Sequence, residues 1–137
     1  MINEDYKINV EYFIKDQILD NRAIGCGIYI IELLKSNTKG AIPLYIGQSL
    51  TMLKRGGEHL YDFFKEPSYL GLSKDNMKDS QLKIRFRVLE KCVSADRFKR
   101  ETNQINKIHP ILQKSTNDNM LDIDNKKKNV KEALEKV

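Results

Sequence analysis

The sequence has few of the features that mark exported, membrane or disulfide-bonded proteins. It contains two cysteines, Cys26 and Cys92, whose spacing suits neither a zinc site nor a disulfide framework. No apolar run approaches the ~20 residues of a membrane-spanning helix. The stretch 1–16 is charged throughout and has no apolar segment like that of a signal peptide. We therefore expect a cytoplasmic protein with reduced thiols and no membrane partner, in which Cys26 is a small buried hydrophobic residue.

The charge of the chain is concentrated in its middle. A length of 137 residues suits one domain with a single modest core, and the formal net charge is +5. Residues 27–113 hold 15 Lys and Arg against 9 Asp and Glu, a net charge of +6. The two flanks together hold 9 against 10, a net charge of −1. The basic excess lies where a polyanionic ligand such as DNA would require it.

A β-hairpin is predicted near the start of this basic segment. Two short runs rich in β-branched and aromatic residues, 27–31 and 44–47, enclose a turn-forming segment with Ser, Asn and Gly. Strand alternation would point Tyr29 away from the face that holds Ile28 and Ile30. We therefore expect that the Tyr29 phenol need not be part of the core.

A helix is predicted to follow the hairpin, with Ser49 or Thr51 as its N-cap. Arg55 and His59 are four residues apart and would share one face of this helix. Two glycines, 56–57, interrupt the helical pattern. They predict either a kink or a close contact between helix and sheet, or else a backbone that a phosphate can approach beside Arg55.

A second clear strand is predicted over residues 81–89, where apolar and basic side chains alternate. The basic stripe consists of Lys83, Arg85 and Arg87. Such a stripe is either a solvated face or a track for a phosphate backbone. The following helix, which Pro110 ends, would place Glu101 on the same face as Phe98, Ile105 and Ile108. A carboxylate that faces a sheet needs either a salt bridge or a metal ion.

The two flanks and the stretch 65–81 contain no recognisable catalytic or metal-binding motif. Four apolar residues with helical spacing, Val10, Phe13, Ile14 and Ile18, predict an amphipathic helix laid on the core or on a partner subunit. A homo-oligomer built on this stripe is a further expectation. Residues 65–81 read as a long polar connection. Residues 114–137 read as a flexible tail or an oligomer contact, with a short helical pattern near the end.

Taken together, these residues resemble the GIY-YIG nuclease superfamily. Gly27-Ile28-Tyr29 and Tyr45-Ile46-Gly47 match its two naming tripeptides, and the resemblance covers roughly residues 25–113. Arg55 and His59 fall where that family has a catalytic arginine and a frequent histidine. Glu101 would match its metal-binding glutamate and Pro110 the proline that follows. Gln48 stands where some members have a lysine, so the chain resembles the histidine-using branch, which is similar to small restriction and phage-type endonucleases.

The resemblance implies a set of roles for these residues. The catalytic residues would be Tyr29, Tyr45, Arg55, His59 and Glu101, with either tyrosine aligning the attacking water and His59 accepting a phenol proton. Glu101 would hold the metal, Mg²⁺ with Mn²⁺ as a substitute. Gly47 and Gln113 would support the site, although many members have asparagine at the latter position. The residues expected to bind DNA are Lys54, Lys83, Arg85 and Arg87.

The implied fold is α+β, with a small three-stranded antiparallel β-sheet flanked by helices. Residues 1–24 would form an N-terminal helical extension, 25–113 the nuclease domain and 114–137 a polar C-terminal tail. The implied function is a divalent-metal-dependent DNA endonuclease of the restriction, phage or mobile-element type. The alternative is a non-catalytic nucleic-acid-binding module on the same fold.

Overall fold

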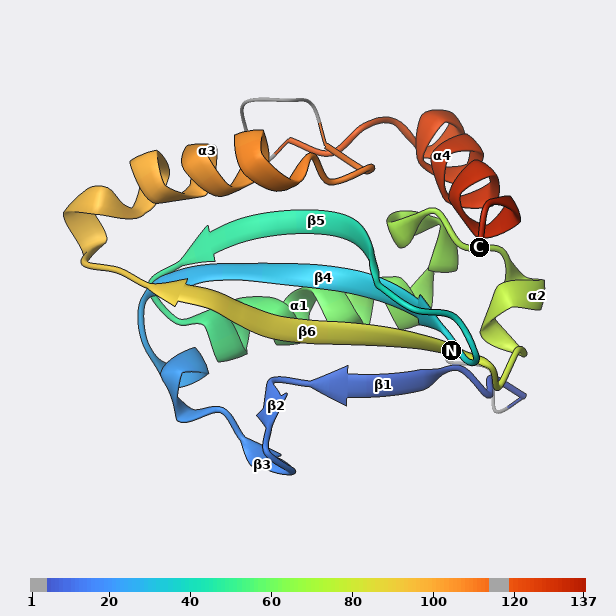
Figure 1. The fold of residues 1–137 in the computed structure, drawn as a ribbon, viewed down its shortest axis with the longest axis horizontal. Coiled ribbons are helices and arrows are strands. Elements are labelled where there is room, and N and C mark those ends of the chain that lie inside the picture. The colour runs from blue at the N-terminus through green and yellow to red at the C-terminus, as the bar shows by residue number, and fades with distance from the viewer. Residues whose placement is uncertain (1–4, 114–118) are drawn as a thin grey trace.

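The computed structural model describes residues 5–113 and 119–137, and its centre is a four-stranded mixed sheet (Figure 1). The strand order is β1-β6-β4-β5, with β4 antiparallel to both neighbours and β1 parallel to β6. A separate antiparallel pair, β2 and β3, follows β1. The strands are β1 (Asn9–Tyr12), β2 (Ile14–Lys15), β3 (Ile18–Leu19), β4 (Gly27–Lys35), β5 (Ile42–Ser49) and β6 (Leu82–Lys91).

Helices connect and cover these strands. The α-helices are α1 (Met52–Lys65), α2 (Lys74–Met77), α3 (Arg97–Ile108) and α4 (Ile123–Glu135). Three short 3₁₀ helices are η1 (Asn21–Ile24), η2 (Pro67–Leu70) and η3 (Ser94–Asp96). Within the described part of the chain, none of the helices has the length and apolar character needed to cross a membrane.

The sheet is buried on both faces over much of its length, because α1 packs on one face and α3 on part of the other. Tyr29, Ile31 and Phe86 face the larger core cluster, which includes Met52 and Phe63 of α1. Ile28, Ile30 and Ile46 point the opposite way and pack against Ile105 of α3. The alternation predicted for β4 is confirmed. Tyr29 is nevertheless 1% exposed, so the expectation that its phenol need not lie in the core is wrong.

The predicted three-stranded antiparallel sheet is wrong, although the α+β class and its three antiparallel strands are present. The segment expected to be an N-terminal helix instead forms β1, which pairs in parallel with β6, and then the β2–β3 pair. A strand of β6's length would otherwise leave an open edge, and β1 occupies that edge. The order of pairing is a tertiary outcome that local spacing does not encode.

The apolar stripe expected on that helix therefore does not exist as one face. Phe13 is fully buried, whereas Ile14 and Ile18 are 41% and 69% exposed. Phe13, Asp16 and Gln17 have positive φ angles, which are incompatible with a continuous right-handed helix. The predicted homo-oligomer loses this basis and stays a prediction.

The C-terminal segment is a packed helix rather than only a tail. Helix α4 begins at the N-cap Asp122, whose side chain accepts a hydrogen bond from the Asn125 backbone N–H, and it packs against η2. Val130 of α4 is buried in the main core. Residues 1–4 and 114–118 of the two predicted flanking regions lie outside the described residues.

Candidate active site

Helix α1 places the predicted Arg55 and His59 in different environments. Its N-cap is Thr51, as one of the two predicted alternatives had it. His59 is 1% exposed and points into the core, while the Arg55 side chain is 44% exposed. A Cβ on Gly56 would lie 2.7 Å from the Phe13 ring, so this glycine permits a close contact between α1 and the chain that follows β1. That observation favours the packing interpretation of the glycine pair.

A chain of two hydrogen bonds crosses the buried centre of the site. The Tyr29 hydroxyl lies 2.9 Å from His59 Nε2, so the predicted tyrosine–histidine pair is brought together. The other ring nitrogen, Nδ1, lies 2.7 Å from the hydroxyl of Tyr69 in η2. Both nitrogens of one imidazole are therefore bonded to phenols. A neutral imidazole can satisfy this arrangement because it has one donor and one acceptor nitrogen.

Burial keeps the three hydrogen-bonded groups, Tyr29, His59 and Tyr69, in their neutral forms. Desolvation, with a smaller effect of the Arg55 and Lys126 charges, lowers the pKa of His59 to about 3. Desolvation raises the pKa of Tyr29 far above its ordinary range, and Arg55 offsets only part of that rise. The pKa of Tyr69 is also raised, again mainly by burial. A free tyrosinate or a free imidazolium is thus strongly disfavoured here, which limits the chemistry to coupled proton movements.

Tyr45 and Gly47 complete the wall of the site from β5. The Tyr45 ring lies 5.0 Å from the His59 ring and 6.4 Å from the Tyr29 ring, measured between centroids. Gly47 is the residue opposite Tyr29 in the β4–β5 register. A Cβ at this position would lie 2.5 Å from Tyr29 Cζ, so only glycine leaves room for the phenol ring. The predicted supporting role of Gly47 has a steric basis.

Gln113 holds β5 from outside the sheet. Its side-chain amide accepts a hydrogen bond from the Ile46 N–H and donates one to the Ile46 carbonyl, each at 2.7 Å. The backbone N–H groups of Ile111 and Leu112 donate to the carbonyls of Pro43 and Leu44. The segment after α3 therefore lines the edge of β5, and the Gln113 side chain reaches the backbone of that strand.

Glu101 lies on α3 with only 4% of its surface exposed. It is close enough to Tyr29 for its negative charge to add slightly to the rise in the pKa of Tyr29 that burial causes. No cluster of three or more His, Cys, Asp or Glu that could hold a metal is present among the described residues. One carboxylate with water and phosphate oxygens is still a donor set that Mg²⁺ uses, so the residues present fit such an ion.

Arg55 and Lys54 line an open pocket beside this buried centre. The pocket has a volume of about 480 Å³ and is formed by one side of α1, with Glu58 and Tyr61 among its other residues. Arg55 Nη1 lies 3.4 Å from Glu58 Oε1 in an exposed ion pair, a contact of small energetic value. Arg55 is therefore available to a phosphate.

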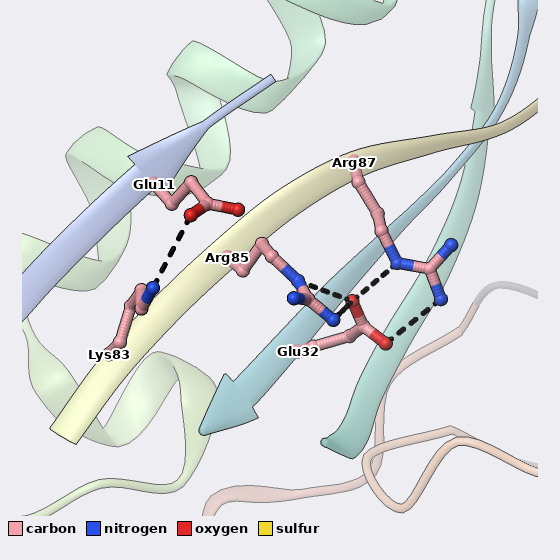
Figure 2. A network of polar contacts seen from close by, with 5 residues as sticks. All are labelled: Glu11, Glu32, Lys83, Arg85 and Arg87. Atoms are coloured by element: carbon pink, nitrogen blue, oxygen red, sulfur yellow. Dashed lines mark hydrogen bonds and ion pairs between the residues drawn. The ribbon is translucent and has the colours of Figure 1, made fainter. Parts of the chain in front are cut away.

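The predicted basic stripe on β6 lies on the sheet face away from α1 (Figure 2). Arg85 and Arg87 both bond to Glu32 Oε1, at 3.0 and 2.7 Å, and Lys83 lies 3.3 Å from Glu11 Oε1. The structure thus does not bring the stripe together with Tyr29 and His59. These three basic residues are engaged with two carboxylates, and their role in binding DNA stays a prediction.

Sequence reasoning missed three residues. Tyr69 lies in a segment whose sequence predicts a polar connection. Pro67, at the start of η2, was the one local signal of a helical turn there. Lys126 of α4 is 6% exposed, donates to the Tyr69 carbonyl at 2.8 Å, and places Nζ 4.9 Å from the centroid of that ring. Glu32 is buried beneath two arginines. None of these contacts follows from local sequence spacing.

Similarity to known proteins adds nothing to this description. No family model, curated protein or solved structure matches the chain. The assignment of function therefore depends on the residues and their geometry.

Proposed function

We propose that this protein is a divalent-metal-dependent DNA endonuclease that hydrolyses phosphodiester bonds. The observation that carries the proposal is the contact of 2.9 Å between the Tyr29 hydroxyl and Nε2 of His59. His59 lies on α1, the helix that also presents Arg55. This arrangement joins a group that can orient and deprotonate water to a cation that can bind a phosphate. The restriction, phage or mobile-element type is part of this proposal and comes from the resemblance of the sequence.

The chain's own residues suggest how the proton would move. Because a tyrosinate is strongly disfavoured at position 29, the hydroxyl would pass its proton to His59 Nε2 as it accepts one from water. Arg55 lowers the pKa of His59, so a phosphate that pairs with Arg55 would offset that effect and make the imidazole more basic. Substrate binding would thereby favour the proton transfer.

The remaining residues would orient the substrate and hold the ion. Tyr45 and Gly47 fix the position of the Tyr29 ring, and Gln113 fixes β5. Glu101 would be the protein ligand of Mg²⁺, or of Mn²⁺ in its place. When bound, such an ion would neutralise charge on the phosphate as the leaving oxygen departs. Lys54 and Arg55 would contact the DNA backbone at the pocket on α1.

The test is incubation of purified protein with supercoiled plasmid and Mg²⁺ or Mn²⁺. We expect conversion to nicked or linear DNA, lost in Glu101→Gln and on addition of a chelator. Plasmid that stays supercoiled with every divalent metal between pH 6 and 10 would contradict the proposal. Salt-dependent retention of DNA in a gel without any cleavage would favour the alternative, a non-catalytic nucleic-acid-binding module.

A further inference from the structure

The hydrogen-bond chain through His59 has a direction that the surroundings of its two phenols decide. In one arrangement Nδ1–H donates to Tyr69 and the Tyr29 hydroxyl donates to Nε2. In the other, Tyr69 donates to Nδ1, and Nε2–H donates to Tyr29. The two arrangements differ in the tautomer of a neutral imidazole. Only the first leaves a free lone pair on Nε2 to receive a proton from Tyr29.

The hydroxyl proton of Tyr29 has a hydrogen-bond acceptor in the first arrangement only. Tyr29 is 1% exposed, and its bond to His59 is the only hydrogen bond of that hydroxyl within the described part of the chain. If Nε2 donated to it, its own proton would be buried without an acceptor, which is costly. In the folded protein without substrate, the hydroxyl of Tyr29 is therefore the donor.

The hydroxyl of Tyr69, unlike that of Tyr29, can reach a second hydrogen-bond partner. Its side chain is half-buried and lines a pocket of about 370 Å³ between α1 and α4, together with Ile123 and Lys126. When Tyr69 accepts from Nδ1–H, its own proton can point toward water in this pocket. The cost of a buried donor without a partner then falls on neither phenol.

Lys126 holds Tyr69 in the required position. Its ammonium donates to the Tyr69 carbonyl at 2.8 Å and also lies 4.9 Å from the centre of the ring, within the range of a cation–π contact. Helix α4 is thereby joined to His59 through a single tyrosine, although the two are far apart in sequence.

We propose that Tyr69, held by Lys126 of α4, is a positioning residue that fixes His59 as the Nδ1–H tautomer with Nε2 as proton acceptor for Tyr29. This inference rests on the proposed function for its consequence in catalysis, but the tautomer itself is a property of the folded protein. Helix α4 is then part of the support of the active site.

The tautomer can be read without any assay of activity. His59 and His109 are the two histidines of the chain, so the ring nitrogens in ¹⁵N-labelled protein are readily assigned by NMR with a His109→Asn variant. We expect the proton of His59 on Nδ1 at pH 7. A folded parent protein with the proton on Nε2 would overturn the inference, whether or not the protein cuts DNA.

The variant Tyr69→Phe removes the acceptor of the Nδ1 proton. We expect a shift of His59 toward the Nε2–H tautomer and a loss of roughly tenfold in cleavage rate at saturating DNA, the loss expected for one hydrogen bond. The Michaelis constant for DNA should stay within about twofold, because no phosphate contact is removed. The matched control is Tyr6→Phe, which removes a hydroxyl from a half-buried tyrosine packed on Phe64.

The variant Lys126→Met keeps the length of the side chain and removes its charge, with exposed Lys128→Met of the same helix as control. We expect a higher NMR-measured pKa for His59 in Lys126→Met, since the lysine charge lowers it. An active parent with an unchanged tautomer and rate in Tyr69→Phe would overturn this inference and leave the nuclease proposal standing. An inactive parent with the Nδ1–H tautomer would do the reverse.

Discussion

The burial of His59 predicts how the free energy of unfolding depends on pH, and this prediction does not require any enzymatic activity. The unfolded chain takes up a proton at this histidine below its ordinary pKa of 6.5, whereas the folded protein keeps it neutral down to a pKa of about 3. The unfolded state therefore binds more protons in this range, and the free energy of unfolding falls as the pH is lowered. His59 therefore does not lower the free energy of unfolding above pH 6.5 and lowers it progressively below that pH.

The size of the effect follows from the two pKa values. Between pH 7 and pH 5 the unfolded histidine becomes almost fully protonated while the folded one does not, which costs about 2 kcal/mol of stability. Asp20, whose pKa is lowered mainly by a hydrogen bond from Arg22, titrates below this window and adds nothing to it. The loss attributable to His59 is a large part of the stability of a small domain.

The assay is urea unfolding at pH 7 and pH 5, followed by circular dichroism, for the parent and His59→Gln. Glutamine cannot titrate, so we expect the pH-dependent loss of the variant to be about 2 kcal/mol smaller than that of the parent, even if the variant is less stable at both pH values. His109→Asn is the control, because His109 is exposed at the end of α3 with φ of 58°, a conformation that asparagine tolerates. Equal losses in the parent and His59→Gln would refute the account of a buried neutral histidine.

The other predictions concern the site more directly. Glu101→Gln should abolish plasmid cleavage and leave DNA retention in gels nearly unchanged, because it removes a ligand charge and keeps the shape. Arg55→Lys should lose at least about tenfold in rate with unchanged unfolding, since lysine lacks the planar fork that binds phosphate; parent-like cleavage would reduce Arg55 to general electrostatics. Tyr29→Phe should be nearly inactive and Tyr45→Phe less affected, as measured in one pH series at saturating Mg²⁺, and full activity of Tyr29→Phe would exclude the proposed proton path. Gly47→Ala should lower the thermal midpoint by several degrees, since its Cβ would lie 2.5 Å from Tyr29 Cζ.

Local sequence patterns were sufficient to predict the elements that have a clear periodicity. The β4–β5 hairpin, α1, β6 and α3 each show a clear alternation or helical spacing together with a cap or a turn, and all four are present. The spacing of four residues between Arg55 and His59 predicts that they stand one turn apart on one helix, and both lie on α1. The pairing of His59 with Tyr29, by contrast, was an implication of the resemblance, and spacing alone did not predict it.

Other features depend on neighbours distant in the chain and could not be predicted from local patterns. Residues 9–12 became a strand because β6 offered an open edge, and residues 14–15 and 18–19 paired with each other, even though the apolar spacing resembled a helix. The burial of Tyr29 came from α1 covering its face of the sheet, and the neutral state of His59 came from the loss of water around it. Tyr69 and Lys126 reach the site only because η2 packs against α1 and α4 packs against η2. A hydrogen bond between residues far apart in sequence leaves no periodic trace, so such contacts are visible only once the chain is folded.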